Sequence, residues 1–157
     1  MAAKSSNERR WLERNKIALE PLREHTLAML PVFEAQGLSN STYGLARTRL
    51  AGPAWTALFD ALAEASVQKA SDFAPQAIAN TAWAFATAKH ASPALFDALA
   101  MDIARRGGVA ALRDRRATVA ITEAFEAVGV PLPRAEKSAK KRKKQDASKA
   151  VEKKGRR

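Results

Sequence analysis

The sequence contains no cysteine, which excludes disulfides, thiolate metal sites and a cysteine nucleophile. It has only two histidines, His25 and His90, which are too few for most all-histidine metal sites. No apolar run approaches the roughly 18 residues that a membrane helix needs. Catalytic signals are equally scarce, because there is no glycine-rich phosphate loop and neither histidine has an evident carboxylate or nucleophile partner. We therefore expect a protein that is not an enzyme, without metal, cofactor, small-molecule substrate or membrane contact.

Signals for β-structure are also missing. The chain has no β-branched runs, no alternating apolar and polar pattern, and no Asn-Gly or Asp-Gly hairpin turn. Alanine, the best helix former, accounts instead for 35 of the 157 residues. These features predict an all-α fold.

Positive charge is concentrated at the C-terminal end. Lysine and arginine outnumber acidic residues by 27 to 16, and residues 134–157 hold 12 of the basic and 3 of the acidic residues. We expect this tail to be disordered, because it has charge but no apolar periodicity. Its basic run is a candidate nucleic-acid arm or nuclear-import signal. The run comprises Lys140, Lys141, Arg142, Lys143 and Lys144.

An internal repeat organises the rest of the chain. The heptapeptide Ala-Leu-Phe-Asp-Ala-Leu-Ala occurs at 57–63 and again 37 residues later at 94–100. Upstream segments match at an offset of 40, and three extra residues at 54–56 account for the difference. The matched pairs are Gln36 and Gln76, Asn40 and Asn80, Tyr43 and Trp83, and Pro53 and Pro93. Units of about 40 residues with helical periodicity are typical of α-solenoids.

The repeat predicts a helical-repeat domain over 7–133, followed by the tail at 134–157. We expect about three antiparallel hairpins and one further helix, with boundaries at 7–32, 33–70, 71–108 and 109–133. Terminal units of a solenoid are atypical because one side faces water. Consistent with this, Arg116, Ala120 and Glu123 stand where the central unit has Gln76, Asn80 and Trp83. Each proline of the pair Pro53 and Pro93 suits the first turn of a second helix, and we expect glycines, among them Gly37, Gly52 and Gly107, to mark helix ends.

The pattern Phe-x-x-Gln-x-Ile-Ala-Asn-x-x-Trp-Ala-Phe-Ala, followed by Pro-x-Leu-Phe, resembles the octotricopeptide and heptatricopeptide repeats. These repeats occur in RAP-domain and FAST-kinase-domain-like proteins of algae and protists. The resemblance implies RNA binding in a mitochondrion or chloroplast, in RNA maturation, stability, translation or ribosome assembly. It covers 71–106 best, and no RAP-like domain follows the repeats, so no nuclease activity is carried over.

Two interpretations apply to the recurring polar and aromatic residues. Gln36, Asn40, Gln76 and Asn80 either contact bases or bond to neighbouring backbone or adjacent repeats as scaffold, and we favour scaffold because residues shared by all repeats cannot discriminate bases. Variable positions nearby, such as Thr81, Ala84 and Thr87, would then read sequence. Tyr43 and Trp83, together with Trp11, either stack on bases or belong to the core, and we favour the core. Trp55, in the insertion, is expected to be exposed.

Basic residues gather at the expected hairpin ends and are candidates for phosphate contacts. Arg105 and Arg106 would also stabilise a helix C-terminus through its dipole. The candidates are Arg47, Arg49, Lys89, His90, Arg105, Arg106, Arg113, Arg115 and Arg116.

Two functions of different classes remain open from the sequence. The first is a non-catalytic RNA-binding repeat module whose partner is single-stranded or ribosomal RNA, with ribosomal or other proteins as further partners. The second is a protein-interaction scaffold whose basic tail serves nuclear import or solubility, since repeat solenoids present surfaces suited to either partner.

Overall fold

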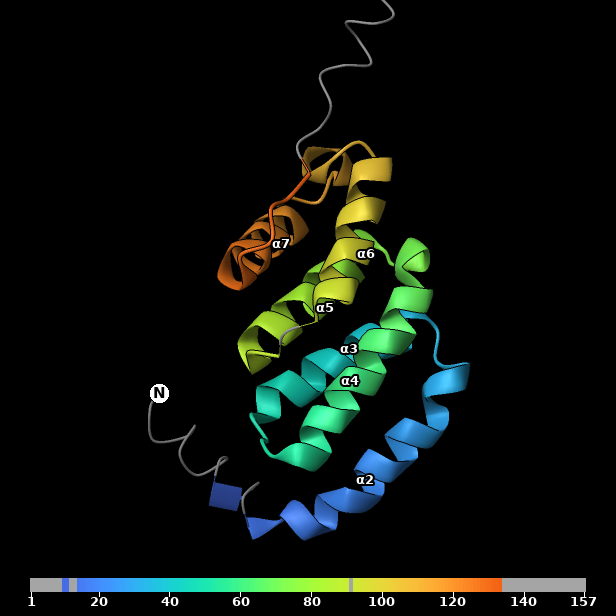
Figure 1. Cartoon of the computed structure of the whole chain (residues 1–157), viewed down its shortest axis with the longest axis vertical. Helices are drawn as coiled ribbons and strands as arrows, with labels where there is room; N and C mark the ends of the chain where they lie inside the picture. The colour runs from blue at the N-terminus through green and yellow to red at the C-terminus, as the bar shows by residue number, and fades with distance from the viewer. Residues whose placement is uncertain (1–9, 12–13, 91, 134–157) are drawn as a thin grey trace, which may run out of the picture.

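The structure of the protein is a computed structural model that describes residues 10–11, 14–90 and 92–133. Within this part of the chain there are α-helices and short 3-10 helices and no strands, which confirms the predicted all-α class. The helices pack in two layers, as a helical repeat does (Figure 1). The predicted disordered tail at 134–157 and most of the segment 7–15 lie outside the described residues.

The first layer, which we call layer A, contains α3 (Ala35–Thr48), α5 (Pro75–Ala88) and α7 (Arg115–Val128). Each of these helices has 14 residues, and each begins 40 residues after the one before. A 3-10 turn precedes each helix, at Leu30–Val32, Ala70–Asp72 and Val109–Leu112 respectively. The 40-residue offset found in the sequence is therefore the spacing of layer A.

The second layer, layer B, contains α2 (Lys16–Met29), α4 (Pro53–Gln68) and α6 (Pro93–Arg105). Pro53 and Pro93 occupy the first turn of α4 and α6, as predicted, where a missing N–H costs no hydrogen bond. The three extra residues 54–56 make α4 longer, at 16 residues against 13 in α6. The connection after α6, residues 106–114, is three residues longer than 69–74 after α4, and this restores the 40-residue spacing before α7.

Layer A helices approach one another much more closely than layer B helices do. Small buried side chains make this approach possible, because they leave the backbones room to meet. Ser39 in α3 donates a hydrogen bond from its hydroxyl to the carbonyl of Ala77 in α5, at 3.3 Å. The equivalent residues one step further, Ala79 and Ala117, are also buried.

Large aromatic side chains fill the space between the two layers. Phe59 of α4 meets Phe85 of α5 edge to face, with ring centroids 5.4 Å apart. Phe96 of α6 meets Phe125 of α7 in the same way at 5.1 Å. Edge-to-face contacts are a favoured geometry for aromatic rings. These pairs tie each layer B helix to a layer A helix and close the core.

Several local predictions were wrong. Trp55 was expected at the surface but is 5% exposed, because its place in the first turn of α4 directs it into the core. Trp11 was expected in the core but is 54% exposed. Gly37 lies inside α3 and ends no helix, whereas Gly52 and Gly107 flank helix ends as predicted.

Candidate nucleic-acid interface

One face of layer A is formed by side chains at equivalent positions of successive helices, and its amide and aromatic residues recur on α3 and α5. Because the helices begin 40 residues apart, residues 40 apart occupy the same place on each helix. The members of this set, which we call the A face, are exposed or half-buried. They are Gln36, Gln76 and Arg116; Asn40, Asn80 and Ala120; Tyr43, Trp83 and Glu123; and Arg47, Thr87 and Ala127.

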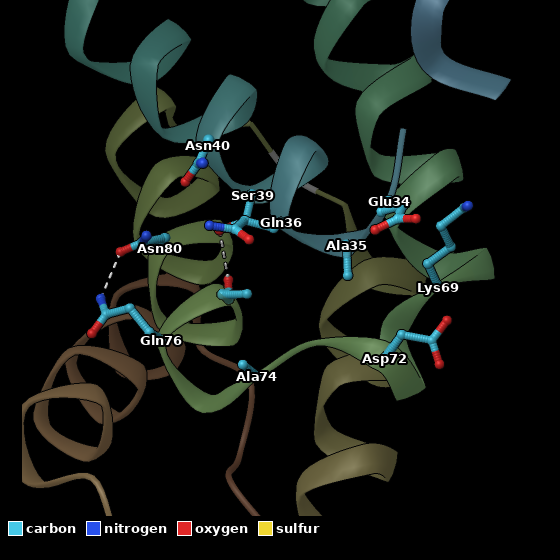
Figure 2. Close-up of a pocket in the computed structure, with 11 residues that line it drawn as sticks. Glu34, Ala35, Gln36, Ser39, Asn40, Lys69, Asp72, Ala74, Gln76 and Asn80 are labelled. Carbon is cyan, nitrogen blue, oxygen red and sulfur yellow. Dashed lines mark hydrogen bonds between the residues drawn. The ribbon is translucent and has the colours of Figure 1, made fainter. Parts of the chain in front are cut away.

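The amides of the A face border an open groove between α3 and α5. The groove has a volume of about 640 Å³ and lies at the N-terminal halves of both helices (Figure 2). Gln76 Nε2 donates to Asn80 Oδ1 at 2.8 Å, a bond along one helix that leaves both side chains at the groove. The predicted scaffold role expects bonds to neighbouring backbone or to adjacent repeats, and the bond observed for Gln76 is to a side chain of its own helix. Asn40 and Gln36 lie across from this pair on α3.

The two aromatic residues of the A face lie against each other at the surface. The ring centroids of Tyr43 and Trp83 are 4.9 Å apart, with their planes tilted by 41°. The guanidinium carbon of Arg47 lies 5.9 Å from the Tyr43 ring centroid, within the range of a cation–π contact. Both aromatics are half-buried, so the prediction that they belong to the core is wrong in part. Both side chains remain partly exposed.

The structure separates the basic candidates into two groups at opposite ends of layer A. The helices α3 and α5 run parallel, so their C-terminal ends share one side of the molecule. A 14-residue helix is about 21 Å long, so the two groups lie far apart. Arg47, Arg49, Lys89 and His90 belong to the C-terminal ends, whereas Arg105, Arg106, Arg113, Arg115 and Arg116 lie at the end where α6 finishes and α7 begins.

Two arginines of the second group are held by a buried carboxylate. Asp102 in α6 is 4% exposed, and its carboxylate pairs with Arg105 and, at 2.6 Å from Nε, with Arg106. Arg106 also donates to the backbone carbonyl of Ser71, at 3.0 Å. These contacts explain why both arginines stand at the end of α6. Arg113, Arg115 and Arg116 are exposed.

The imidazole of His90 pairs with a carboxylate and packs against two aromatic rings. Its Nε2 lies 2.8 Å from Oδ1 of Asp60 in α4, and its ring lies 5.5 Å from the Phe59 ring and 5.8 Å from that of Phe85. The carboxylate partner absent from the neighbouring sequence is thus supplied by the preceding hairpin, 30 residues away. Only 14% of the His90 side chain is exposed, which removes it from the set of direct phosphate contacts.

Thr81 was predicted to read sequence and is instead fully buried, as is Ala84. The Thr81 hydroxyl has no hydrogen-bond partner in the described residues. The prediction failed because it assumed that only one side of α5 is buried. As the middle helix of layer A, α5 packs against α3 on one side and α7 on the other, so only a narrow stripe stays open. Thr87, the other variable candidate, is exposed on that stripe.

Arg49 and Lys89 have an unusual backbone that was not anticipated from the sequence. Each follows the last residue of its helix with a left-handed conformation, at φ 55° and φ 53°. Gly129 holds the equivalent place after α7 with φ 73°, which is the ordinary way to end a helix. The sequence could have indicated this, because Arg49 and Lys89 lie 80 and 40 residues before Gly129, and glycine is the usual residue with this conformation at a helix end.

Other kinds of site find no support in the described part of the chain. No group of three or more metal-ligating side chains gathers there, and no helix within it has both the length and the hydropathy to cross a membrane. The basic run Lys140–Lys144 lies outside the described residues. Comparison with known proteins finds no matching family model, no matching curated protein and no matching solved structure.

Proposed function

We propose that this protein is a non-catalytic RNA-binding helical-repeat protein that contacts single-stranded RNA through the A face. The observation that carries the proposal is the presentation of amide and aromatic side chains at a constant 40-residue spacing on the accessible side of α3 and α5, with the cation Arg47 beside the aromatic pair. Together with the resemblance to octotricopeptide repeats, this supports a role in organellar RNA processing, RNA stability or ribosome assembly.

The chemistry of the A face suits an unpaired strand. Aromatic rings stack on bases, and each stacked base is worth about 1–3 kcal/mol. Amide side chains donate and accept hydrogen bonds, so they pair with the edges of splayed bases. Arg47 lies beside the aromatic pair, where a cation neutralises phosphate. The amide groove next to the pair gives room for a base to enter.

The proposal places binding on α3 and α5. At the equivalent positions of α7, Ala120 and Glu123 replace the amide and the aromatic residue, so this helix offers neither stacking nor amide pairing. Glu123 would also repel phosphate. The contact should therefore be short, covering the bases that two repeats can reach.

Fluorescence anisotropy with a labelled random single-stranded RNA pool tests the proposal. We expect the full chain to bind the pool, and Tyr43→Leu and Trp83→Leu each to weaken binding about tenfold, because each removes a stacking surface worth about 1–3 kcal/mol. Trp11→Leu is the matched control, since Trp11 is an exposed aromatic outside layer A. Thermal melts followed by circular dichroism would show that all three variants are folded.

Two results would overturn the proposal. One is a full chain that does not bind the pool at low salt. The other is equal RNA binding by Trp83→Leu and Trp11→Leu, which would leave the A face without a role and assign all affinity to charge.

A protein-binding scaffold remains the second candidate, and one observation favours it. Met101 on α6 and Val119 on α7 are 74% and 50% exposed, and large apolar side chains at a surface suit a protein partner. Co-purification of a defined protein that is lost in Met101→Glu and Val119→Glu, without RNA binding by the wild type, would support this function instead.

A further inference from the structure

A second groove lies at the C-terminal ends of α3 and α5, beyond the A face. Its volume is about 420 Å³, and the last turns of both helices line it together with the first turn of α4. Buried Trp55 and Phe59 form part of its wall. Arg49 and Lys89 stand at the groove, one contributed by each layer A helix.

The backbone at these two cations is strained. Left-handed φ values disfavour side chains with a Cβ, and glycine adopts them freely. The equivalent position after α7 is Gly129, so the fold accepts glycine there. Residues held in unfavourable backbone conformations cluster at functional sites. Two positively charged residues, Arg49 and Lys89, therefore stand at one groove, in positions where glycine would end the helix with less backbone strain.

The charge at this groove is suited to an anion. Both cations are exposed, and none of the residues that line the groove is acidic, whereas Glu34 and Asp72 line the amide groove. The nearby carboxylate of Asp60 is paired with His90. The N-terminus of α4, where Gly52 supplies no side-chain cap, adds the positive end of a helix dipole.

The backbone carbonyls at the C-terminal ends of α3 and α5 carry partial negative charge and would repel an anion. Some of them, however, are already satisfied by hydrogen bonds. In α3 the carbonyl of Ala46 accepts from the N–H of Arg49, and in α5 the carbonyl of Phe85 accepts from the N–H of His90. Such bonds satisfy acceptors that would otherwise face the groove. Each helix end contributes only about half an elementary charge, whereas each of the two side-chain cations carries a full one.

We propose that this groove is a phosphate site, in which Arg49 and Lys89 hold one phosphate group between α3 and α5. Guanidinium and ammonium groups are the usual donors to phosphate oxygens in proteins. Resting on the proposed RNA binding, the phosphate is a diester of the strand whose bases lie on the A face. Thr87, which lines the groove one turn after Trp83, makes the two surfaces continuous.

Inorganic phosphate is the first probe. Amide NMR shifts of the full chain are followed on titration with phosphate, against chloride at equal ionic strength and pH. We expect saturable shifts at Arg49, Gly52 and Lys89, and at least tenfold weaker binding in the double variant Arg49→Gly/Lys89→Gly. The double variant should also melt about 3 °C higher or more, because glycine relieves the left-handed strain.

Arg113→Gly is the matched control. Arg113 is the third residue with a strained left-handed backbone, at φ 55°, and it is also a cation, but it lies at the opposite end of layer A. This variant relieves the strain of one such residue and removes one charge, half of what the double variant does, and it should keep the phosphate shifts at Arg49 and Lys89. Loss of those shifts in Arg113→Gly, or an undiminished phosphate shift at Gly52 in the double variant, would overturn the site.

Single-stranded RNA is the second probe and separates this proposal from the general one. If the full chain binds RNA, the double variant should lower the slope of log affinity against log salt by about 0.7, because it removes one phosphate contact. An unchanged slope would overturn the groove and leave RNA binding by the A face intact. Phosphate shifts without any RNA binding would uphold the phosphate site and overturn the proposed function.

Discussion

The two layers of this solenoid are built by different rules. Layer A repeats at a constant 40 residues with helices of constant length, whereas the layer B helices have 14, 16 and 13 residues. Layer A helices touch through small side chains with their backbones close, so a change of length or register there would create clashes or voids. Layer B helices stand further apart, and their large aromatic side chains pack against layer A. Variation in length is thus accepted only where the helices do not meet closely.

The difference also locates function. A surface on which equivalent side chains lie at regular intervals requires helices of constant length and constant spacing, and only layer A has both. The A face belongs to it, and both grooves lie between its helices α3 and α5. Layer B contributes Asp60, which pairs with His90 of the next hairpin, and Asp102, which pairs with its two arginines within the end of α6.

The largest expected difference between the layers is in how a three-residue deletion affects folding. Deleting 79–81 from α5 turns the rest of that helix by about 60° and shortens it by about 4.5 Å, which destroys both close contacts, so we expect cooperative unfolding to be lost. Deleting 54–56 from α4 gives it the length of α6 and should leave a folded protein, less stable by about 3–5 kcal/mol because Trp55 is lost from the core. Urea denaturation followed by circular dichroism measures both. A cooperative transition in the α5 deletion would contradict the distinction between the layers.

Substitutions on opposite sides of α5 sharpen the comparison between its buried and open faces. Phe85→Ala should lower the free energy of unfolding by about 3–5 kcal/mol, because the side chain is fully buried against Phe59 of layer B. Trp83→Ala, on the half-buried A face, should lower it by only about 1 kcal/mol. Urea midpoints give both values, and similar losses would mean that the A face is part of the core.

Asp102→Asn tests how much the ion pairs of the buried Asp102 carboxylate contribute to stability at the end of α6. The substitution removes the charge that pairs with Arg105 and Arg106, and we expect a loss of about 2 kcal/mol, since the carboxylate is buried while the arginines keep access to water. Asp97→Asn is the control on the same helix, where the carboxylate is exposed and the change should stay within about 0.5 kcal/mol. Equal effects in thermal or urea unfolding would show that the pairs contribute nothing.

The smallest expected effect is a gain in stability within layer A. Thr81→Val replaces a buried hydroxyl that has no partner in the described residues with a methyl group of similar shape, so the free energy of unfolding should rise by about 1 kcal/mol. Thr87→Val, at the exposed equivalent of Arg47, should leave it nearly unchanged. Destabilisation by Thr81→Val would indicate that the hydroxyl has a partner.

Much of the fold could be predicted from the sequence, because repeats and alanine content are properties of the chain alone. The all-α class, the 40-residue spacing and the first-turn positions of Pro53 and Pro93 follow from pattern and propensity. The candidate site was less predictable. Helical periodicity identifies an apolar stripe, but alanine and threonine occur both in cores and at surfaces, so Thr81 was placed wrongly.

What the sequence by itself determined is the local and periodic part of this protein: which segments are helical, where they begin, and that they repeat. The tertiary structure decided which residues meet. It gave His90 its partner in the preceding hairpin, placed Trp55 in the core, and brought Arg49 and Lys89, 40 residues apart, to one groove. The physical reason is that helix propensity acts over a few neighbouring residues, whereas burial and charge pairing depend on contacts between helices, which exist only after the layers have packed.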